Sequence, residues 1–156
     1  MTEIDQKQTE LNTASNYFSE ILMSCDLMVY LKRSDMPAPS VWRKAITDAG
    51  FPVILDDDFD VFSFTGFLPC PVNGELAGFE YYVAPTSSED IAELGLAPEL
   101  GFSVQFIIGS RPLELTAALA ASSVLASVSG GVLVDQQEGE VIGANDAINW
   151  ANAQLG

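Results

Sequence analysis

The stretch PLELTAALAASSVLASVSGGVLV, residues 112–134, decides the fold class because it joins a helix directly to a strand. Pro112 suits the first position of a helix, and the alanines and leucines after it favour helix up to about Val128. Only one charged residue interrupts the stretch, so this helix is expected to pack against other elements on more than one side. Gly130-Gly131 then ends the helix, and residues 132–134 are expected to form a strand.

On both sides of this unit, short apolar segments bounded by charges, prolines or glycines predict further helices and strands. The expected helices cover residues 9–24, 40–49, 87–94, 112–128 and 145–151, and the expected strands cover residues 26–32, 51–55, 61–68, 79–84, 102–108, 132–134 and 140–142. Either Ser40 caps the second helix or Pro39 opens it. Pro69-Cys70-Pro71 is expected to be loop, and Asn73-Gly74 predicts a tight turn.

This order of elements predicts a single α+β domain over residues 1–156, in which residues 1–9 are disordered. Two βαβ-like passages flank an antiparallel hairpin region, which predicts a mixed or antiparallel sheet with helices mainly on one face. The most specific expectation is a ferredoxin-like core with extra helices. A chain of 156 residues with 48% hydrophobic residues can build such a core without disulfides or metals.

The charge of the chain is strongly negative and unevenly distributed. Its 22 acidic and 6 basic residues give a formal net charge of −16. Residues 1–47 are nearly balanced, whereas residues 48–156 hold sixteen acidic residues and a single basic residue, Arg111. Such a surface repels nucleic-acid phosphates and anionic lipids and attracts basic proteins. Solubility alone would also explain acidity, but the excess favours a basic protein partner, with no nucleic acid and no membrane.

The residues that most enzymes use are missing from this sequence. It contains no histidine, which removes the commonest general base and metal ligand. Cys25 and Cys70 are the only cysteines, and without histidine they cannot complete a structural zinc site unless carboxylates join them. No phosphate-binding glycine loop or nucleophile elbow is present. We therefore predict a protein that is not an enzyme and has no catalytic, cofactor-binding or metal-binding residues.

The sequence also predicts where the protein resides. Residues 1–20 are polar and lack the apolar segment of a signal peptide. The apolar stretch from Leu113 to Val134 is better explained as a buried helix and a strand than as a membrane span. We therefore expect a cytoplasmic protein with reduced thiols.

Two groups of acidic residues are the candidate partner-binding sites. The first consists of Asp56, Asp57, Asp58 and Asp60, and the second of Glu89, Asp90 and Glu93. Carboxylates this close repel one another until a cation approaches, which attracts a lysine or arginine of a partner. The first group departs from a calcium loop, which needs Gly and Glu where this chain has Val61 and Phe67. An irregular divalent-cation site or a solvated loop stays open for the first group, and helix capping for the second.

Arg111 stands where a strand meets the long helix. We expect it to pair with a nearby acidic residue such as Glu114, and contact with an anion beside the helix N-terminus is the alternative. An apolar loop is expected to pack inside the fold, or to serve as a hydrophobic anchor if it is exposed; it consists of Phe67, Leu68, Pro69 and Pro71.

In its profile the chain resembles the immunity proteins of bacterial toxin–immunity pairs. The resemblance rests on the size, the α+β pattern, the missing catalytic residues and the acidic segment 56–60, and it covers the whole chain without a family-specific motif. It implies a small cytoplasmic protein that occludes a basic toxin domain, for instance a nuclease. Two other classes stay open: a small enzyme or ligand-binding domain that uses carboxylate pairs, and a cytoplasmic adaptor or regulatory module that binds a basic protein.

Overall fold

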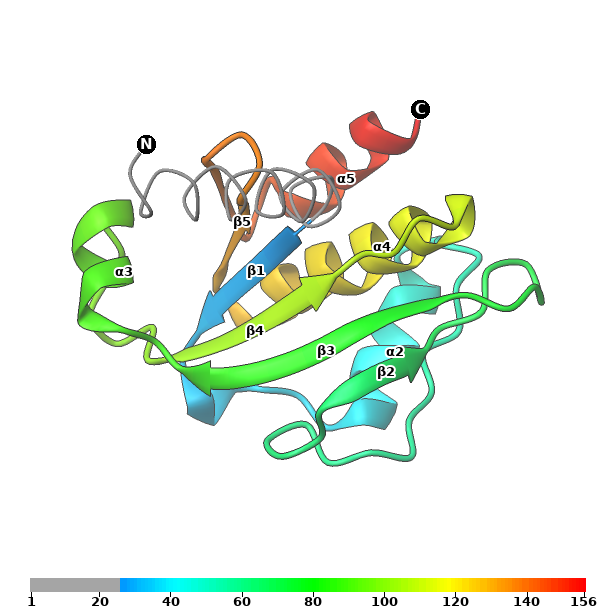
Figure 1. Cartoon of the computed structure of the whole chain (residues 1–156), viewed down its shortest axis with the longest axis horizontal. Coiled ribbons are helices and arrows are strands. Elements are labelled where there is room, and N and C mark those ends of the chain that lie inside the picture. Colours follow the sequence, from blue (N-terminus) through cyan, green and yellow to red (C-terminus); the bar gives the residue numbers. More distant parts are fainter. Residues whose placement is uncertain (1–25) are drawn as a thin grey trace, which may run out of the picture.

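The structure of the chain is a computed structural model that describes residues 26–156 (Figure 1). The strands are β1 Asp26–Leu31, β2 Gly66–Pro69, β3 Gly78–Pro85, β4 Phe102–Ile107, β5 Val132–Asp135 and β6 Glu140–Gly143. The helices are α2 Pro39–Asp48, α3 Ser88–Leu94, α4 Pro112–Ser129 and α5 Ala147–Leu155, and a 3-10 turn, η1, covers Arg33–Asp35. The helix expected over residues 9–24 and the disorder expected for residues 1–9 lie outside the described residues.

The strands form one six-stranded antiparallel sheet in the order β2-β3-β4-β1-β5-β6. Through its four central strands the chain runs β1-α2-β3-β4-α4-β5, with β2 and α3 as insertions. β1 and β3 therefore run parallel to each other, with β4 between them. β4 and β5 also run parallel to each other, with β1 between them. This is the split βαβ arrangement of a ferredoxin-like core. The predicted α+β class and the predicted core are confirmed.

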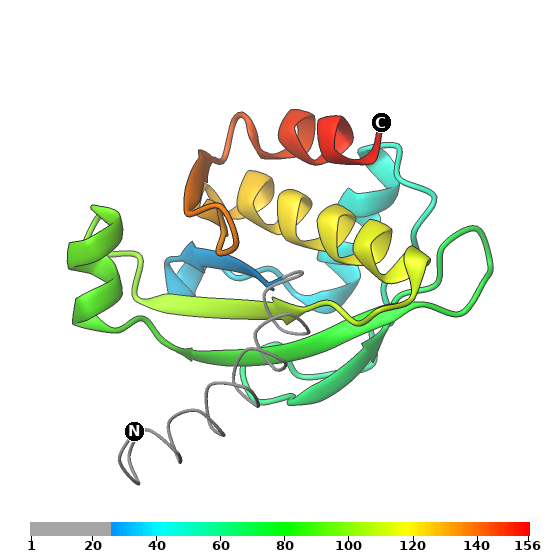
Figure 2. The same cartoon turned by 45° about the horizontal axis from the view of Figure 1, so that its top comes forward.

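Helices α2, α4 and α5 cover one face of the sheet, as expected (Figures 1 and 2). α4 lies against the sheet and contacts both α2 and α5. By length and composition α4 is apolar enough to cross a membrane, but 67% of it is buried inside the fold. Contacts on several sides explain why a core helix of this kind needs no polar face.

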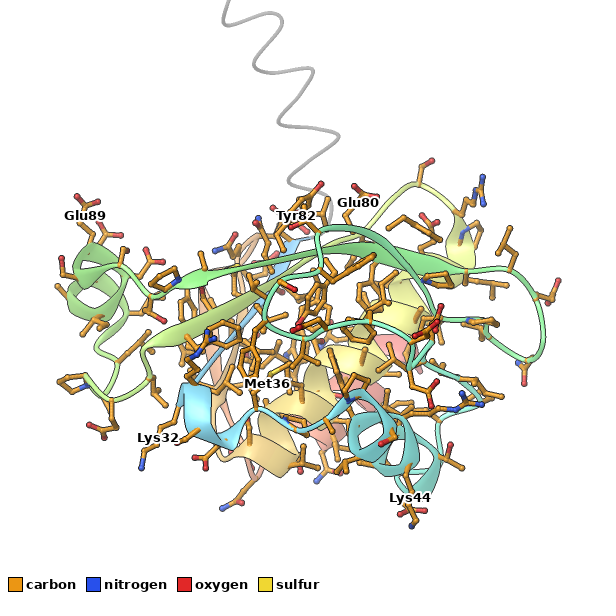
Figure 3. The ribbon with its side chains drawn as sticks, turned by 90° about the horizontal axis from the view of Figure 1, so that it is seen from below. Lys32, Met36, Lys44, Glu80, Tyr82 and Glu89 are labelled. Carbon is orange, nitrogen blue, oxygen red and sulfur yellow. The ribbon has the colours of Figure 1, made fainter. Side chains whose placement is uncertain are left out.

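The strand residues alternate between two faces of the sheet, because successive side chains in a strand point in opposite directions. Leu27 and Val29 of β1 face the helices and belong to the main core. Met28 and Tyr30 face the other side, where they pack with Leu96, which follows α3. Figure 3 shows Glu80 and Tyr82 of β3 on this same side, away from α2. Among the described helices, α3 therefore packs on the sheet face opposite to the one that α2, α4 and α5 cover.

Trp42 of α2 lies at the centre of the main core. Its side chain is fully buried, and its Nε1–H donates to the carbonyl of Ala121 in α4 at 3.0 Å. Its ring lies 6.3 Å from Phe59, 6.3 Å from Tyr81 of β3 and 6.1 Å from Phe106 of β4 between centroids. Aromatic contacts at these distances stabilise a core beyond the area they bury. Trp42 therefore connects two helices, the sheet and the loop that follows α2.

The strand expected over residues 51–55 does not form, apart from an isolated bridge. The amide of Ile54 donates to the carbonyl of Pro71 at 3.0 Å, and the amide of Asp56 donates to the carbonyl of Pro69 at 3.0 Å. Proline has no N–H to donate in return, so a ladder of reciprocal hydrogen bonds cannot form here. The predicted strand is therefore wrong, although Phe51, Val53 and Leu55 are buried.

The strand expected over residues 61–68 forms only at its end, as β2. The carboxylate of Asp60 accepts from the amide of Phe62 at 2.8 Å, and its carbonyl accepts from the amide of Phe64 at 2.9 Å. Short acidic side chains favour turns because they bond the backbone two residues further on. The residues just after Asp60 therefore form a turn in spite of their alternating pattern.

The helix starts and the tight turn follow the sequence signals. Pro39, and not Ser40, is the first residue of α2. Ser87 caps α3, since its side chain accepts from the amide of Asp90 at 3.0 Å. Asn73-Gly74 has φ angles of 51° and 79°, as a tight turn of this type requires.

Candidate functional site

The first acidic group lies in the loop between α2 and β2, which we call the acidic loop (residues 56–60). Phe59 in this loop packs against Trp42 and against Tyr81, with ring centroids 6.3 Å and 5.4 Å apart. Both partners belong to the main core on the helix-covered side of the sheet. One partly buried aromatic ring thus holds the acidic loop in place, and most of the loop's carboxylates are exposed around it.

Three of the four carboxylates in the acidic loop have partners nearby. Asp56 accepts from the amide of Asp58 at 2.9 Å, and Asp60 accepts from the amide two residues further on. Asp57 forms an ion pair with Arg43 of α2 at 3.5 Å, in which both side chains are about 40% exposed. Within the described part of the chain the carboxylate of Asp58 has no partner. Asp56 and Asp60 therefore shape the loop, whereas Asp57 and Asp58 are available to a partner protein.

The second acidic group lies on α3. Asp90 accepts a hydrogen bond from the hydroxyl of Tyr30 at 3.0 Å, which ties α3 to the central strand of the sheet. Burial, followed by this bond to Asp90, raises the pKa of the Tyr30 hydroxyl above its usual range. Glu89 and Glu93 are exposed. Asp90 is therefore mainly structural, and Glu89 and Glu93 are the available carboxylates of this group.

The structure does not bring the two acidic groups together. α3 packs with the small cluster around Tyr30 on one face of the sheet, and the acidic loop packs with the main core on the other. Figure 3 shows Glu89 of α3 and Lys44 of α2 at opposite ends of the molecule. Lys44 directly follows Arg43, which forms the ion pair with the acidic loop. The predicted residues therefore form two separate acidic surfaces.

Asp90 and Glu93 also line an open pocket of about 290 Å³ beside Tyr30 and Gln136. Two carboxylates and a tyrosine hydroxyl in one pocket could bind a small polar ligand. Within residues 26–156 no group of three or more His, Cys, Asp or Glu side chains is arranged to hold a metal ion.

Sequence reasoning missed a third acidic feature, Glu114 in the first turn of α4. Its side chain is only 7% exposed, and it is the one charged residue among the buried residues of the described chain. The ion pair that we expected with Arg111 does not form, although both residues line the same open pocket of about 410 Å³. The signal that could have revealed it is a lone carboxylate inside an otherwise uncharged helix.

Asp26, the first residue of β1, carries a half-buried carboxylate. One of its oxygens accepts from the side-chain amide of Gln105 at 3.3 Å, and the other has no hydrogen-bond partner among the residues that the structure describes. Burial raises the pKa of Asp26, and the bond from Gln105 only partly opposes this effect. A charge held in this way destabilises the folded state at neutral pH.

Replacing Asp26 with asparagine is therefore expected to increase the free energy of unfolding at neutral pH. Because the pKa of Asp26 is higher in the folded state, folding takes up a proton, and this residue costs less stability as the pH falls through that pKa. The gain from asparagine should shrink between neutral pH and about pH 4. Urea unfolding of both proteins across this range measures it, and a gain that does not vary with pH would contradict the assignment.

Cys70 is enclosed between Pro69 and Pro71 and is fully buried, and burial raises the pKa of its thiol to about 12. Only the thiolate reacts with disulfide reagents. In a Cys25→Ser background we expect no reaction of the native protein with such a reagent within minutes, and one thiol per chain after denaturation. Rapid labelling of the native variant would show that the loop around Cys70 opens.

The described residues thus offer two exposed acidic surfaces, one pocket with two carboxylates and one buried carboxylate. Each is held by contacts that reach the core: Phe59 on Trp42, Asp90 on Tyr30, and Glu114 within α4. No protein-family model matches this chain, and no curated protein and no solved structure matches it either.

Proposed function

We propose that this protein is a binding module that recognises a basic partner protein and covers its positively charged surface. The observation that carries the proposal is the uncompensated negative charge. Residues 48–156 hold sixteen acidic residues and one basic residue. Within residues 26–156 the ion pairs are Arg43 with Asp57 and Lys44 with Asp48, and both use cations of α2. A surface of this kind attracts a basic partner and speeds its association.

The two acidic surfaces supply the contacts. The acidic loop presents Asp57 and Asp58, and α3 presents Glu89 and Glu93. Both segments are anchored to buried aromatic residues, so little conformational entropy is lost when a partner's lysines and arginines bind them. Charge-assisted hydrogen bonds to carboxylates are roughly twice as strong as neutral ones.

Among basic partners, a toxin such as a nuclease fits these surfaces best. A nuclease binds the phosphate backbone through lysine and arginine side chains. Carboxylates fixed on a folded domain can occupy the positions that phosphates otherwise take. The protein would then act as the immunity protein of a toxin–immunity pair, by occlusion of the toxin's cleft.

Capture of the partner tests this proposal. The full-length chain is immobilised, exposed to native lysate of the source organism at low salt, and eluted with rising salt. We expect a basic protein to elute, and we expect the purified chain to inhibit its activity. The control is the same experiment with an immobilised variant that carries Asp57→Asn, Asp58→Asn, Glu89→Gln and Glu93→Gln. This variant should retain far less of the basic protein. If the immobilised wild type and the immobilised variant retain the same amount of the basic protein, the proposal is contradicted.

A second candidate function is favoured by the pocket that holds Asp90, Glu93 and Tyr30. A small cationic or polyhydroxylated ligand bound there would make the protein a ligand-binding or enzymatic domain. A thermal-shift screen separates the two functions: such a ligand raises the melting temperature of the wild type but not that of Glu93→Gln.

A further inference from the structure

The pocket at the start of α4 combines apolar walls with the carboxylate of Glu114, a residue that is largely buried. Phe67 of β2 and Leu76 of the turn before β3 line it, and they are 41% and 68% exposed. Gly109, between β4 and α4, also lines it. Exposed large apolar side chains beside an open pocket of about 410 Å³ are typical of a contact surface.

The carboxylate of Glu114 faces this pocket without a partner. Within the described chain it forms no hydrogen bond and no ion pair; the residue as a whole is 7% exposed, and its carboxylate oxygens reach solvent at the pocket. The partial positive charge at the N-terminus of α4 favours a carboxylate in the first turn, but it leaves the oxygens free to accept further hydrogen bonds. A carboxylate without a protein partner, set beside apolar walls, can accept a charge-assisted hydrogen bond from a donor that arrives with the partner protein.

The two oxygens of Glu114 lie at different distances from Gly109. A Cβ on Gly109 would clash with Oε1, whereas Oε2 lies 3.8 Å from the same position. Oε1 therefore lies close to the backbone of Gly109, and Oε2 lies further from it. A carboxylate with one oxygen against the backbone suits a compact ammonium group, since the planar fork of arginine is matched to two oxygens that it can approach side by side.

We propose that this pocket receives a lysine side chain of the partner protein. This inference rests on the proposed function, and it specifies where the partner protein contacts this chain most closely. The aliphatic stem of the lysine lies between Phe67 and Leu76, and its ammonium group donates to Oε2 of Glu114. Arg111 at the rim is exposed, so solvent and salt screen its repulsion more than they screen a contact with a buried carboxylate.

Titration of the isotope-labelled full chain with Nα-acetyl-lysine amide tests the pocket without any partner. We expect the amide resonances of Gly109, Ser110 and Glu114 to shift in a saturable way, and Nε-acetylated lysine to have no such effect because it lacks the charge. Glu114→Gln should weaken binding at least tenfold while the rest of its spectrum stays that of the folded protein. Equal binding by Glu114→Gln, or by the acetylated probe, would overturn the proposal.

A rim variant keeps the test valid if Glu114→Gln does not fold. Leu76→Ser removes an apolar side chain of the pocket wall that is 68% exposed, and it should weaken binding of Nα-acetyl-lysine amide several-fold. Val41→Ser is the matched control, since Val41 is 56% exposed on α2 outside the pocket. Equal effects of the two serine variants would count against the pocket.

Measurements with the captured partner separate this inference from the proposed function. Loss of a buried contact acts mainly on dissociation, so Glu114→Gln should raise the dissociation rate at least tenfold and leave association nearly unchanged. Neutralising the acidic surfaces should act mainly on association. If the partner binds the wild type and Glu114→Gln equally, the lysine pocket is wrong and the proposed function stands. If no basic partner is captured, the proposed function fails, and with it the lysine as a partner's side chain.

Discussion

Replacing Trp42 with alanine is expected to lower the free energy of unfolding by about 3–5 kcal/mol. The substitution removes a fully buried indole and leaves a cavity where α2, α4 and the sheet meet. It also leaves the carbonyl of Ala121 without its donor and Phe59 without one of its ring contacts. Because Phe59 anchors the acidic loop, the variant should lose order in that loop as well as global stability.

Urea unfolding followed by circular dichroism measures this loss. Trp150→Ala is the matched control, because Trp150 is only partly buried on α5 and its Nε1–H donates to the exposed Glu140 at 3.3 Å. We expect the control to lose less than half as much stability. If the two variants lose the same amount, Trp42 is not the centre of the core.

Neutralising the available carboxylates is expected to slow association with the basic partner by about tenfold or more at low salt. The variant carries Asp57→Asn, Asp58→Asn, Glu89→Gln and Glu93→Gln. Within residues 26–156 none of these side chains accepts a backbone hydrogen bond, so stability should change little. Exposed charges act mainly by steering the encounter, and the dissociation rate should therefore stay within a few-fold of the wild type.

A control with the same change of charge distinguishes position from net charge. Asp35→Asn, Glu75→Gln, Glu99→Gln and Glu138→Gln neutralise four exposed acidic residues outside the two acidic surfaces. We expect this control to slow association by less than about threefold, because steering depends on charges near the contact. Equal slowing in both variants would mean that net charge alone attracts the partner and that the acidic surfaces are not the contact.

The parts of the fold that the sequence predicts are those fixed by local signals. Pro112, a run of alanines and leucines and Gly130-Gly131 define α4, and short apolar segments define β1, β3 and β4. The failures at residues 51–55 and 61–68 also have local causes. Pro69 and Pro71 cannot donate to a neighbouring strand, and Asp60 bonds the backbone of the next residues. The prolines and Asp60 are both visible in the sequence, but the apolar residues of the two segments indicated strands more strongly.

The candidate site was less predictable, because it depends on which residues the fold brings together. The sequence identified both acidic groups, but not that Asp56, Asp60 and Asp90 have structural hydrogen bonds. It could not show that the groups lie on separate surfaces, since that follows from the sheet order. The burial of Glu114 also needs the tertiary structure, because it depends on how the start of α4 meets Gly109.

The central claim is that a negative field on this protein brings a basic partner to it. The most direct test is the association rate constant with the captured partner, measured by stopped-flow mixing from about 25 mM to about 300 mM NaCl. We predict that the rate constant falls by about tenfold or more over this range, since salt screens the attraction between opposite charges. A rate constant that stays within about twofold across the whole range would contradict the claim.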